Sequence, residues 1–226
     1  MIFKNIKKSL TLITIYLLLF SCGSSQYSSS FKAEKIDIEE ILFLQPVTTI
    51  MANSQNKIFL DKRISDFNTT LIANTSVQLL SSKYNVKEDS LIKFNKEDIS
   101  RLCNQLLESN RKITDLALIE KINQIKDINQ ERFGLLIIYN GAYNPTYESH
   151  NNWNFNKPSY INNNQITISS SFFTSKVKSE LIVLLFDFKN HEIAFYNKKN
   201  SKTIDPRITK QIEQMTKMSL KSIYYN

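Results

Sequence analysis

Few side chains in this sequence have the types and spacing that acid–base or nucleophilic chemistry requires. Its 226 residues include only two histidines, His150 and His191. Glu148, Ser149 and His150 offer an acid, a hydroxyl and an imidazole, but adjacent residues in a loop seldom converge on one substrate atom, and catalytic triads are defined by geometry. We therefore assign no catalytic residue and expect that the protein is not an enzyme.

Metal and cofactor chemistry also lacks the necessary pattern. Asp187, His191 and Glu192 bracket a predicted turn, and alternation places Asp187 and His191 at its exposed end. A metal site needs a third or fourth ligand at a suitable spacing, and the chain has neither an HExxH motif nor a paired CxxC motif. Only two glycines follow residue 23, too few for a phosphate-binding loop. We expect a solvated turn, no metal and no cofactor.

The clearest binding signal is a polar, aromatic stretch over residues 144–164 that has neither helical nor alternating periodicity. Long loops of this kind are often functional. Aromatic faces beside many asparagine amides suit either stacking on sugar rings or a protein–protein hot spot. The alternative is that the rings fold back as a lid over the sheet edge. The predicted binding surface consists of Tyr143, Tyr147, Trp153, Phe155 and Tyr160.

One cysteine has a context that predicts covalent modification. Three lysines at positions 4, 7 and 8 precede an apolar run over residues 10–20, which is too short to span a bilayer and indicates a removable secretory signal. The ending Leu19-Phe20-Ser21-Cys22 resembles the lipobox of bacterial lipoproteins. This resemblance implies a signal peptide over residues 1–21 and acyl chains on Cys22 that insert into the lipid bilayer. An ordinary cleaved signal peptide is the alternative.

The residues after Cys22 predict how the anchor is connected. Gly23 to Ser30 are small and polar, so residues 22–35 are expected to form a flexible tether. No acidic residue appears before Glu34, a pattern compatible with transfer to the outer membrane in lipoproteins of this type. We expect a membrane-anchored protein, attached to the outer membrane, whose body over residues 36–226 faces the periplasm.

Composition limits the remaining functions. The formal net charge is +8, of which three positive charges lie in the predicted signal. Asn, Lys and Ile are abundant, which A/T-rich codons would produce without any selection for binding. We expect no nucleic-acid partner. If Cys22 is lipidated, Cys103 has no partner within the chain. Its neighbours repeat at helical spacing, so we favour a buried small hydrophobe over a reactive thiol.

The body is predicted to be a single α/β domain with a mixed central sheet. Apolar and β-branched runs predict the strands, and Pro46 predicts a bend or an edge position in the first of them. Amphipathic spacing predicts the helices, with Asn95 and Asp98 as caps of one and Asp205-Pro206 as the start of the last. The predicted strands cover residues 41–50, 90–94, 133–139, 165–173, 181–188 and 192–196, and the helices cover residues 64–84, a segment around 99–107, a segment around 118–125 and a segment from 206 onward.

This order resembles a group of small envelope lipoproteins that includes the curli-secretion lipoprotein and the outer-membrane activators of peptidoglycan synthases. The resemblance rests on the segment ILFLQPV, the segment GLLIIYNGAY, and the segment LIVLLFDFKNHEIAFYNKK before a final helix. It implies a layered α/β domain that works through protein contacts. The chain departs from the pattern at Asn190-His191, where a glycine is usual, and in the insertion over residues 144–164.

These observations predict a membrane-anchored periplasmic lipoprotein that is a non-catalytic accessory of a cell-envelope complex. An envelope protein is the expected partner, bound by the aromatic stretch and the neighbouring hairpin. The alternative is binding of a glycan, either peptidoglycan or another polysaccharide, by the same aromatic residues.

Overall fold

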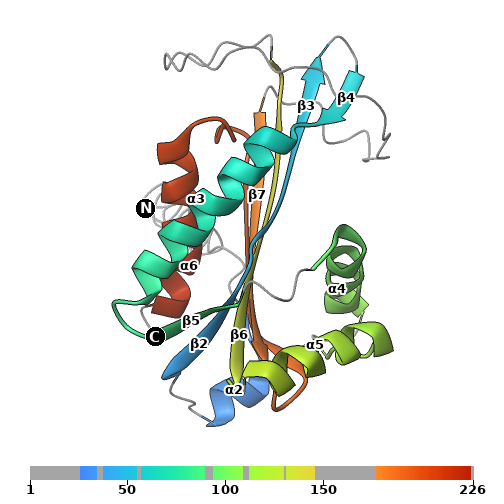
Figure 1. Cartoon of the computed structure of the whole chain (residues 1–226), viewed down its shortest axis with the longest axis vertical. Helices are drawn as coiled ribbons and strands as arrows, with labels where there is room; N and C mark the ends of the chain where they lie inside the picture. The colour runs from blue at the N-terminus through green and yellow to red at the C-terminus, as the bar shows by residue number, and fades with distance from the viewer. Residues whose placement is uncertain are drawn as a thin grey trace, which may run out of the picture.

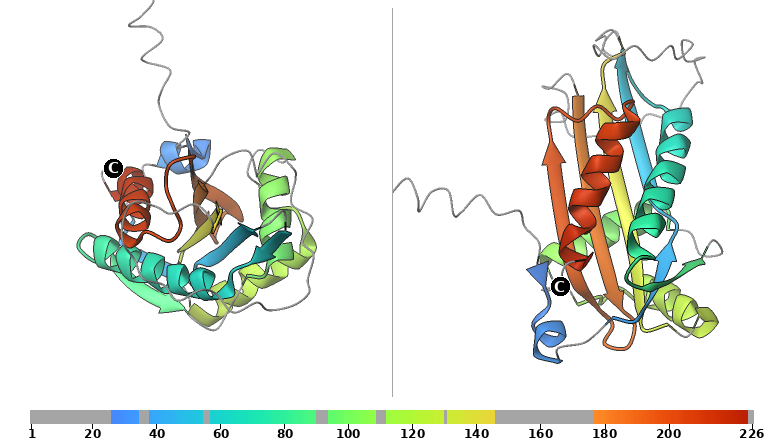
Figure 2. Two further views of the ribbon diagram at one scale, coloured as in Figure 1. Left: turned by 90° about the horizontal axis from the view of Figure 1, so that it is seen from above. Right: turned by 90° about the vertical axis from the view of Figure 1, so that its left-hand side faces the viewer.

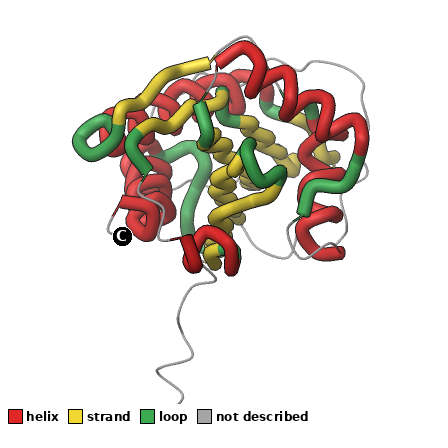
Figure 3. The backbone as a smooth tube through the Cα atoms, turned by 90° about the horizontal axis from the view of Figure 1, so that it is seen from below, coloured by secondary structure: helices red, strands yellow, loops and turns green. Residues whose placement is uncertain are grey.

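The computed structural model describes residues 26–34, 38–54, 57–89, 94–108, 112–129, 131–145 and 177–224, and these form an eight-stranded mixed sheet with helices on both faces (Figures 1 and 3). The predicted α/β fold with a mixed central sheet is therefore confirmed. The strands are β1 (Gln26–Tyr27), β2 (Glu40–Leu44), β3 (Val47–Ser54), β4 (Lys57–Leu60), β5 (Asn85–Asp89), β6 (Phe133–Tyr143), β7 (Val177–Asp187) and β8 (Glu192–Ser201). The helices are α2 (Ser29–Glu34), α3 (Lys62–Leu80), α4 (Lys96–Glu108), α5 (Leu116–Asn129) and α6 (Thr209–Tyr224).

Strands β6 and β7 form the centre of the sheet. Ten of the eleven residues of β6 are buried, as expected for a strand that is covered on both faces. β6 pairs antiparallel with β7 along its whole length, from Phe133 opposite Asp187 to Tyr143 opposite Val177. β8 continues the antiparallel order on the far side of β7, which confirms the predicted hairpin.

The predicted strand over residues 41–50 is divided at Pro46 into two strands. β2 and β3 both run parallel to β6, the first beside Gly134 and Leu135 and the second from Ile138 to Tyr143. Proline has no N–H to donate to the ladder, so the chain bends away from β6 at this point. β5 and β4 then extend the sheet outward from β2 and β3 respectively.

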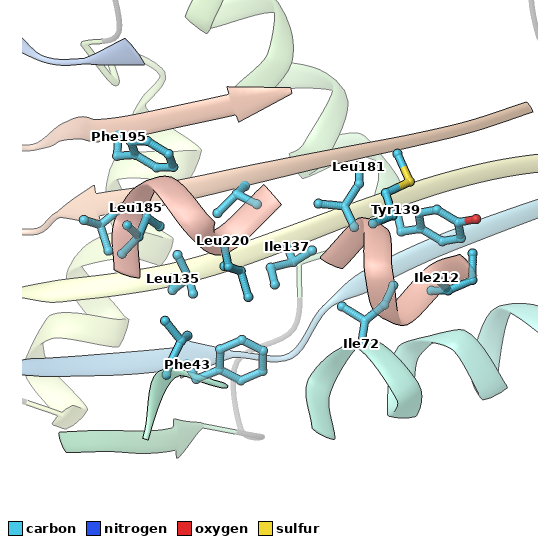
Figure 4. Close-up of a cluster of buried hydrophobic side chains, with 14 of the residues drawn as sticks. Phe43, Ile72, Leu135, Ile137, Tyr139, Leu181, Leu185, Phe195, Ile212 and Leu220 are labelled. Carbon is cyan, nitrogen blue, oxygen red and sulfur yellow. The ribbon is translucent and has the colours of Figure 1, made fainter. Parts of the chain in front are cut away.

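Two layers of helices cover the sheet. α3 and α6 pack on one face, where their side chains join the odd-numbered residues of β6 in one core cluster (Figure 4). α4 and α5 pack on the other face over the even-numbered residues Leu136 and Ile138, which Figure 2 shows from two further directions. No helix within the described residues is long and apolar enough to cross a membrane.

Local hydrogen bonds fix where the helices begin. The Asp61 carboxylate accepts from the Ile64 N–H at 3.0 Å and caps α3. Asn95 and Asp98 each accept from the other's backbone N–H, at 2.8 and 3.0 Å, which confirms the predicted cap of α4.

Two predicted boundaries are wrong. The helix expected to end near residue 84 ends at Leu80, and β5 follows it because Asn85 pairs in parallel with Glu40 of β2. Of the strand expected over residues 90–94, residues 90–93 lie outside the described residues. The last helix begins at Thr209 and not at Pro206, because Asp205 caps a separate turn in which its backbone C=O accepts from Ile208 at 3.0 Å. The strand predicted over residues 165–173 lies outside the described residues.

Residues 26–34 form a strap at the edge of the sheet, which differs from the flexible tether expected over residues 22–35. β1 pairs with β8, and the Tyr27 ring packs against Phe195 with centroids 4.8 Å apart. The Phe31 ring of α2 meets Phe133 edge-on at 5.9 Å. The segment is polar overall, but its two aromatic residues, Tyr27 and Phe31, pack against apolar residues of the body. These contacts hold the segment in place.

Candidate functional site

The structure describes one member of the predicted aromatic surface. Tyr143 is the last residue of β6 and is 4% exposed. Tyr147, Trp153, Phe155 and Tyr160 lie outside the described residues, as does Cys22. The Tyr143 ring is therefore covered by neighbouring side chains and is not exposed as the predicted binding surface requires.

Tyr143 connects three elements at the end of β6. Its hydroxyl donates to the Asp61 carboxylate at 2.6 Å, and Asp61 is itself 5% exposed at the start of α3. The Arg207 guanidinium lies over the Tyr143 ring, 4.7 Å from its centroid. Burial, followed by the hydrogen bond to Asp61, raises the pKa of the Tyr143 hydroxyl well above its usual value. Tyr143 therefore stays neutral at physiological pH and acts as a structural link.

The turn before α6 is fixed to the same end of the sheet. Arg207 forms a paired ion contact with Asp205, at 2.6 Å between Nη2 and Oδ2 and 2.9 Å between Nε and Oδ1. Asn68 of α3 donates to the Pro206 carbonyl at 2.8 Å. A Cβ on Gly141 would lie 2.9 Å from the Pro206 ring, so the turn can approach β6 only where the strand has a glycine.

Exposed apolar side chains occur on both sides of the sheet near this end. Within the described residues, five large hydrophobic side chains are exposed, and three of them come from β4 and the second turn of α3. These are Ile58 and Leu60, both 39% exposed, and Phe67, 48% exposed. In the sheet described here β4 pairs only with β3, so its outer edge presents backbone groups that another strand could pair with. We name this end, with Tyr143, Arg207, Ile58, Leu60 and Phe67, the contact pole.

The turn of the β7–β8 hairpin lies far from Tyr143, although the start of β7 pairs with it. The register places this turn next to Phe133, at the opposite end of β6 from Tyr143. Ten steps along a strand at 3.4 Å separate these two ends by about 34 Å. β3 lies on the other side of β6, with Ala52 opposite Tyr143, so the β3–β4 hairpin also adjoins the contact pole. The sequence did not predict the position of the β3–β4 hairpin, because β2 and β3 pair with different parts of β6 on either side of the bend at Pro46.

The acids near the β7–β8 turn are buried and not solvated as predicted. Asp187 is 1% exposed and binds Arg132, with 2.7 Å between Nη2 and Oδ2. It also accepts from the backbone N–H groups of Lys189 and Asn190 and so shapes the turn. His191 adopts a positive φ of 49°, which glycine usually supplies at such a position. These contacts explain how the turn forms without the expected glycine.

Glu192 holds the N-terminal strap. It is 5% exposed, and the hydroxyls of Ser28 and Ser30 both donate to its Oε1, the former at 2.9 Å. The Lys112 ammonium lies 3.6 Å from its Oε2. Glu192 is therefore a structural anchor for residues more than 160 positions away in the sequence.

The described residues contain no group of three or more His, Cys, Asp and Glu side chains that could hold a metal. Cys103 is half-buried on α4 and packs against the core cluster beneath α4 and α5. Burial, and then the nearby Glu180 carboxylate, raise the pKa of its thiol, so it is a poor nucleophile. This agrees with the preference for a small hydrophobe.

An open groove of about 390 Å³ lies beside the bend at Pro46. Its lining includes the hydroxyls of Thr48 and Thr69, which bond each other. Asp66 is the one ionisable side chain among its described lining residues, and it pairs with Lys62 on the same helix. The groove offers no arrangement for acid–base chemistry.

Three residues of these sites were not singled out from the sequence: Asp61, Arg207 and Arg132. Asp61 stands directly before the amphipathic run of α3, a position typical of an N-cap, so its role was accessible from the sequence. Arg207 and Arg132 carry no comparable signal, because a basic residue beside a turn is common and its partner is set by the tertiary fold.

Comparisons with known proteins give fold similarity alone. No protein-family model matches the sequence, and no curated protein matches it. Similar solved structures include a PelC dodecamer from Paraburkholderia phytofirmans, with 8% identity over 88% of this chain and 96% of that chain and a TM-score of 0.36. Lipoprotein GNA1162 from Neisseria meningitidis has 12% identity over 83% of this chain and 98% of that chain, with a TM-score of 0.34. The C-terminal domain of LpoB from Salmonella enterica has 10% identity over 76% of this chain and 89% of that domain, with a TM-score of 0.31. The chain is thus distantly similar in fold to structures that include a named lipoprotein.

Proposed function

We propose that the protein is a lipid-anchored protein of the bacterial envelope and a non-catalytic accessory that binds a protein partner through the contact pole. Acylated Cys22 holds it to the outer membrane, and the body faces the periplasm. The observation that carries this proposal is the combination of exposed apolar side chains and an open strand edge on a rigid, hydrogen-bonded base.

The base is rigid because its polar groups are already paired. Tyr143, Asp61 and Arg207 bind one another or Asp205, and both Tyr143 and Asp61 are buried, so these groups hold the end of the sheet in place. A catalytic site needs a titratable group that can reach its substrate. The arrangement therefore supports binding better than chemistry.

The exposed part suits a protein. Exposed apolar side chains on a strand whose outer edge has no partner among the described residues are typical of surfaces to which a partner adds a strand. Ile58 and Leu60 are two residues apart on β4 and so project on the same face of the sheet, the face opposite α3, where a paired segment of a partner could cover them. Tyr147, Trp153, Phe155 and Tyr160 follow β6 in the sequence, and we propose that they belong to the same surface.

The test is photo-cross-linking in intact cells with a photoreactive amino acid at position 58 or 60. The matched control has the same group at Leu116, which is 76% exposed on α5, near the opposite end of the sheet from β4 (Figure 1). We expect one envelope protein to be captured from positions 58 and 60 and not from 116, and an Ile58→Asp, Leu60→Asp variant to lose its co-purification. Equal capture from all three positions refutes the contact pole.

Two further experiments test the lipid anchor and the type of partner. Palmitate labelling that survives Cys22→Ala refutes the anchor. Recovery of glycan fragments without a protein partner, together with loss of glycan sedimentation in Trp153→Ala, replaces the protein partner by peptidoglycan or another polysaccharide.

A further inference from the structure

The strap limits how far the body can lie from a membrane, a step that rests on the proposed acylation of Cys22. Gln26 pairs with Tyr196 at the edge of the sheet, and it is the fourth residue after Cys22. Four steps along the chain span at most about 14 Å in any conformation. With the strap in place, Gln26 therefore lies within about 14 Å of the membrane surface.

Helix α6 lies level with this attachment point. Asn197 follows Tyr196 on β8, and its side chain donates to the Ser219 carbonyl at 2.7 Å. The Tyr27 hydroxyl donates to the Ser222 carbonyl, also at 2.7 Å. These contacts place the C-terminal half of α6 beside the strap, and Figure 2 shows the helix next to the strand edge that carries β1.

The outer face of α6 is basic. Its exposed residues are Lys210, Gln214, Lys217, Met218 and Lys221, and their spacing places them on one side of the helix. None of these exposed residues is acidic, and Met218 is 41% exposed. Burial, and then the nearby Lys221 ammonium, lower the pKa of Lys199 on β8, so the two positive charges are close enough to repel. An anionic surface against α6 would relieve that repulsion.

We infer that the exposed face of α6 docks on the anionic headgroups of the bilayer in which Cys22 is anchored. Basic residues around an apolar side chain are typical of helices that lie in the membrane interface. Attraction to anionic headgroups falls off within a Debye length of about 8–10 Å, so it acts only on a face that is held close. The strap supplies this proximity. The acyl chains recruit the protein, and α6 sets its orientation.

The test is quenching of a tryptophan by brominated lipid. The lipidated protein is purified from membranes and reconstituted into vesicles of phosphatidylglycerol and brominated phosphatidylcholine. The reporter is Met218→Trp in a Trp153→Phe background, and the matched control is Leu116→Trp in the same background. We expect the reporter at 218 to be quenched at least about threefold more than the control, because three or more lysines hold α6 at the headgroups. The difference is expected to disappear with Lys217→Glu and Lys221→Glu or at about 0.5 M salt.

Equal quenching at 116 and 218, or a difference that is insensitive to charge reversal, overturns the docking of α6. Failure of the protein to stay on the vesicles, with no palmitate label, overturns the proposed anchor instead. In that case the same two reporters are read with residue 22 held by a polyhistidine tag on a nickel-chelating lipid. The docking of α6 is then supported or overturned by the same comparison.

Discussion

Removing two hydroxyls should release the N-terminal strap from the body. In a Ser28→Ala, Ser30→Ala variant the buried Glu192 carboxylate loses both donors of its Oε1 and keeps Lys112 at 3.6 Å. Hydrogen bonds to charged groups contribute about 1.5–3 kcal/mol each. In the double variant these bonds are missing while the strap is closed, and when the strap detaches, water can bond to the Glu192 carboxylate in their place. We expect the free energy of opening the strap to fall by about 3 kcal/mol, which corresponds to roughly 100-fold faster exchange by opening.

The assay is hydrogen–deuterium exchange of amides 27–32 together with global unfolding in denaturant. The Ser28 N–H, which donates to the Ala194 carbonyl at 2.8 Å, reports the pairing directly. Global stability should change by less than the local value, because β6, β7 and β8 keep their pairing without β1. Ser100→Ala, on the exposed side of α4, is the matched control and should leave the strap unchanged. Unchanged exchange in the double variant, or equal local and global losses, refutes the role of Glu192 as the anchor.

Three other changes test the structure. Gly134→Ala should lower the free energy of unfolding by about 1–3 kcal/mol in denaturant titrations, because the new methyl group overlaps the Phe188 ring, and an unchanged value would show that the ring moves without cost. Burial raises the pKa of Asp98, but the hydrogen bond from Lys121 and the other favourable contacts outweigh it and lower that pKa, so the carboxylate contributes fully to stability above about pH 4 and loses this contribution on acidification. The difference in unfolding free energy between wild type and Asp98→Asn should therefore disappear as the pH falls below about 4. A difference that is independent of pH would refute this. Burial, followed by Tyr84, raises the pKa of Tyr27 to about 12, so strap protection should weaken as the pH rises from about 10 towards 12, and Tyr27→Phe should remove that dependence.

The elements that the sequence predicts best are those whose burial is decided locally. β6 reads as a fully covered strand because nearly every residue is apolar, and the caps of α4 lie within four residues of each other. The bend at Pro46 follows from proline chemistry alone. In contrast, the start of β5 depends on pairing with β2, some 45 residues earlier, so its position could not be read from local composition.

The buried charges show why site residues are harder to predict than strands. Asp187 and Glu192 look like ordinary turn residues, and their partners Arg132 and Ser28 lie 55 and 164 positions away. A charged side chain is buried only when the tertiary fold places a partner beside it. Sequence periodicity does not show which distant residue that partner is. The same reasoning explains Tyr143, which reads as part of a surface but is covered by Asp61 and Arg207.

The two proposed surfaces constrain each other through the direction of the strands. α6 runs alongside the strands of the sheet, so a body whose α6 lies on the bilayer has β6 roughly parallel to the membrane plane (Figure 2). The contact pole then points sideways, about 34 Å along the sheet from the turn at Glu192. Ile58 and Leu60 project from the face of the sheet opposite α6, because Phe59 between them packs against the core under α3 and α6. A partner therefore reaches Ile58 from the side of the sheet that is turned away from the membrane. Cross-links from position 58 to a partner segment that extends away from the membrane are therefore expected, and cross-links only to the partner's membrane-embedded segment would show that one of the two surfaces is assigned incorrectly.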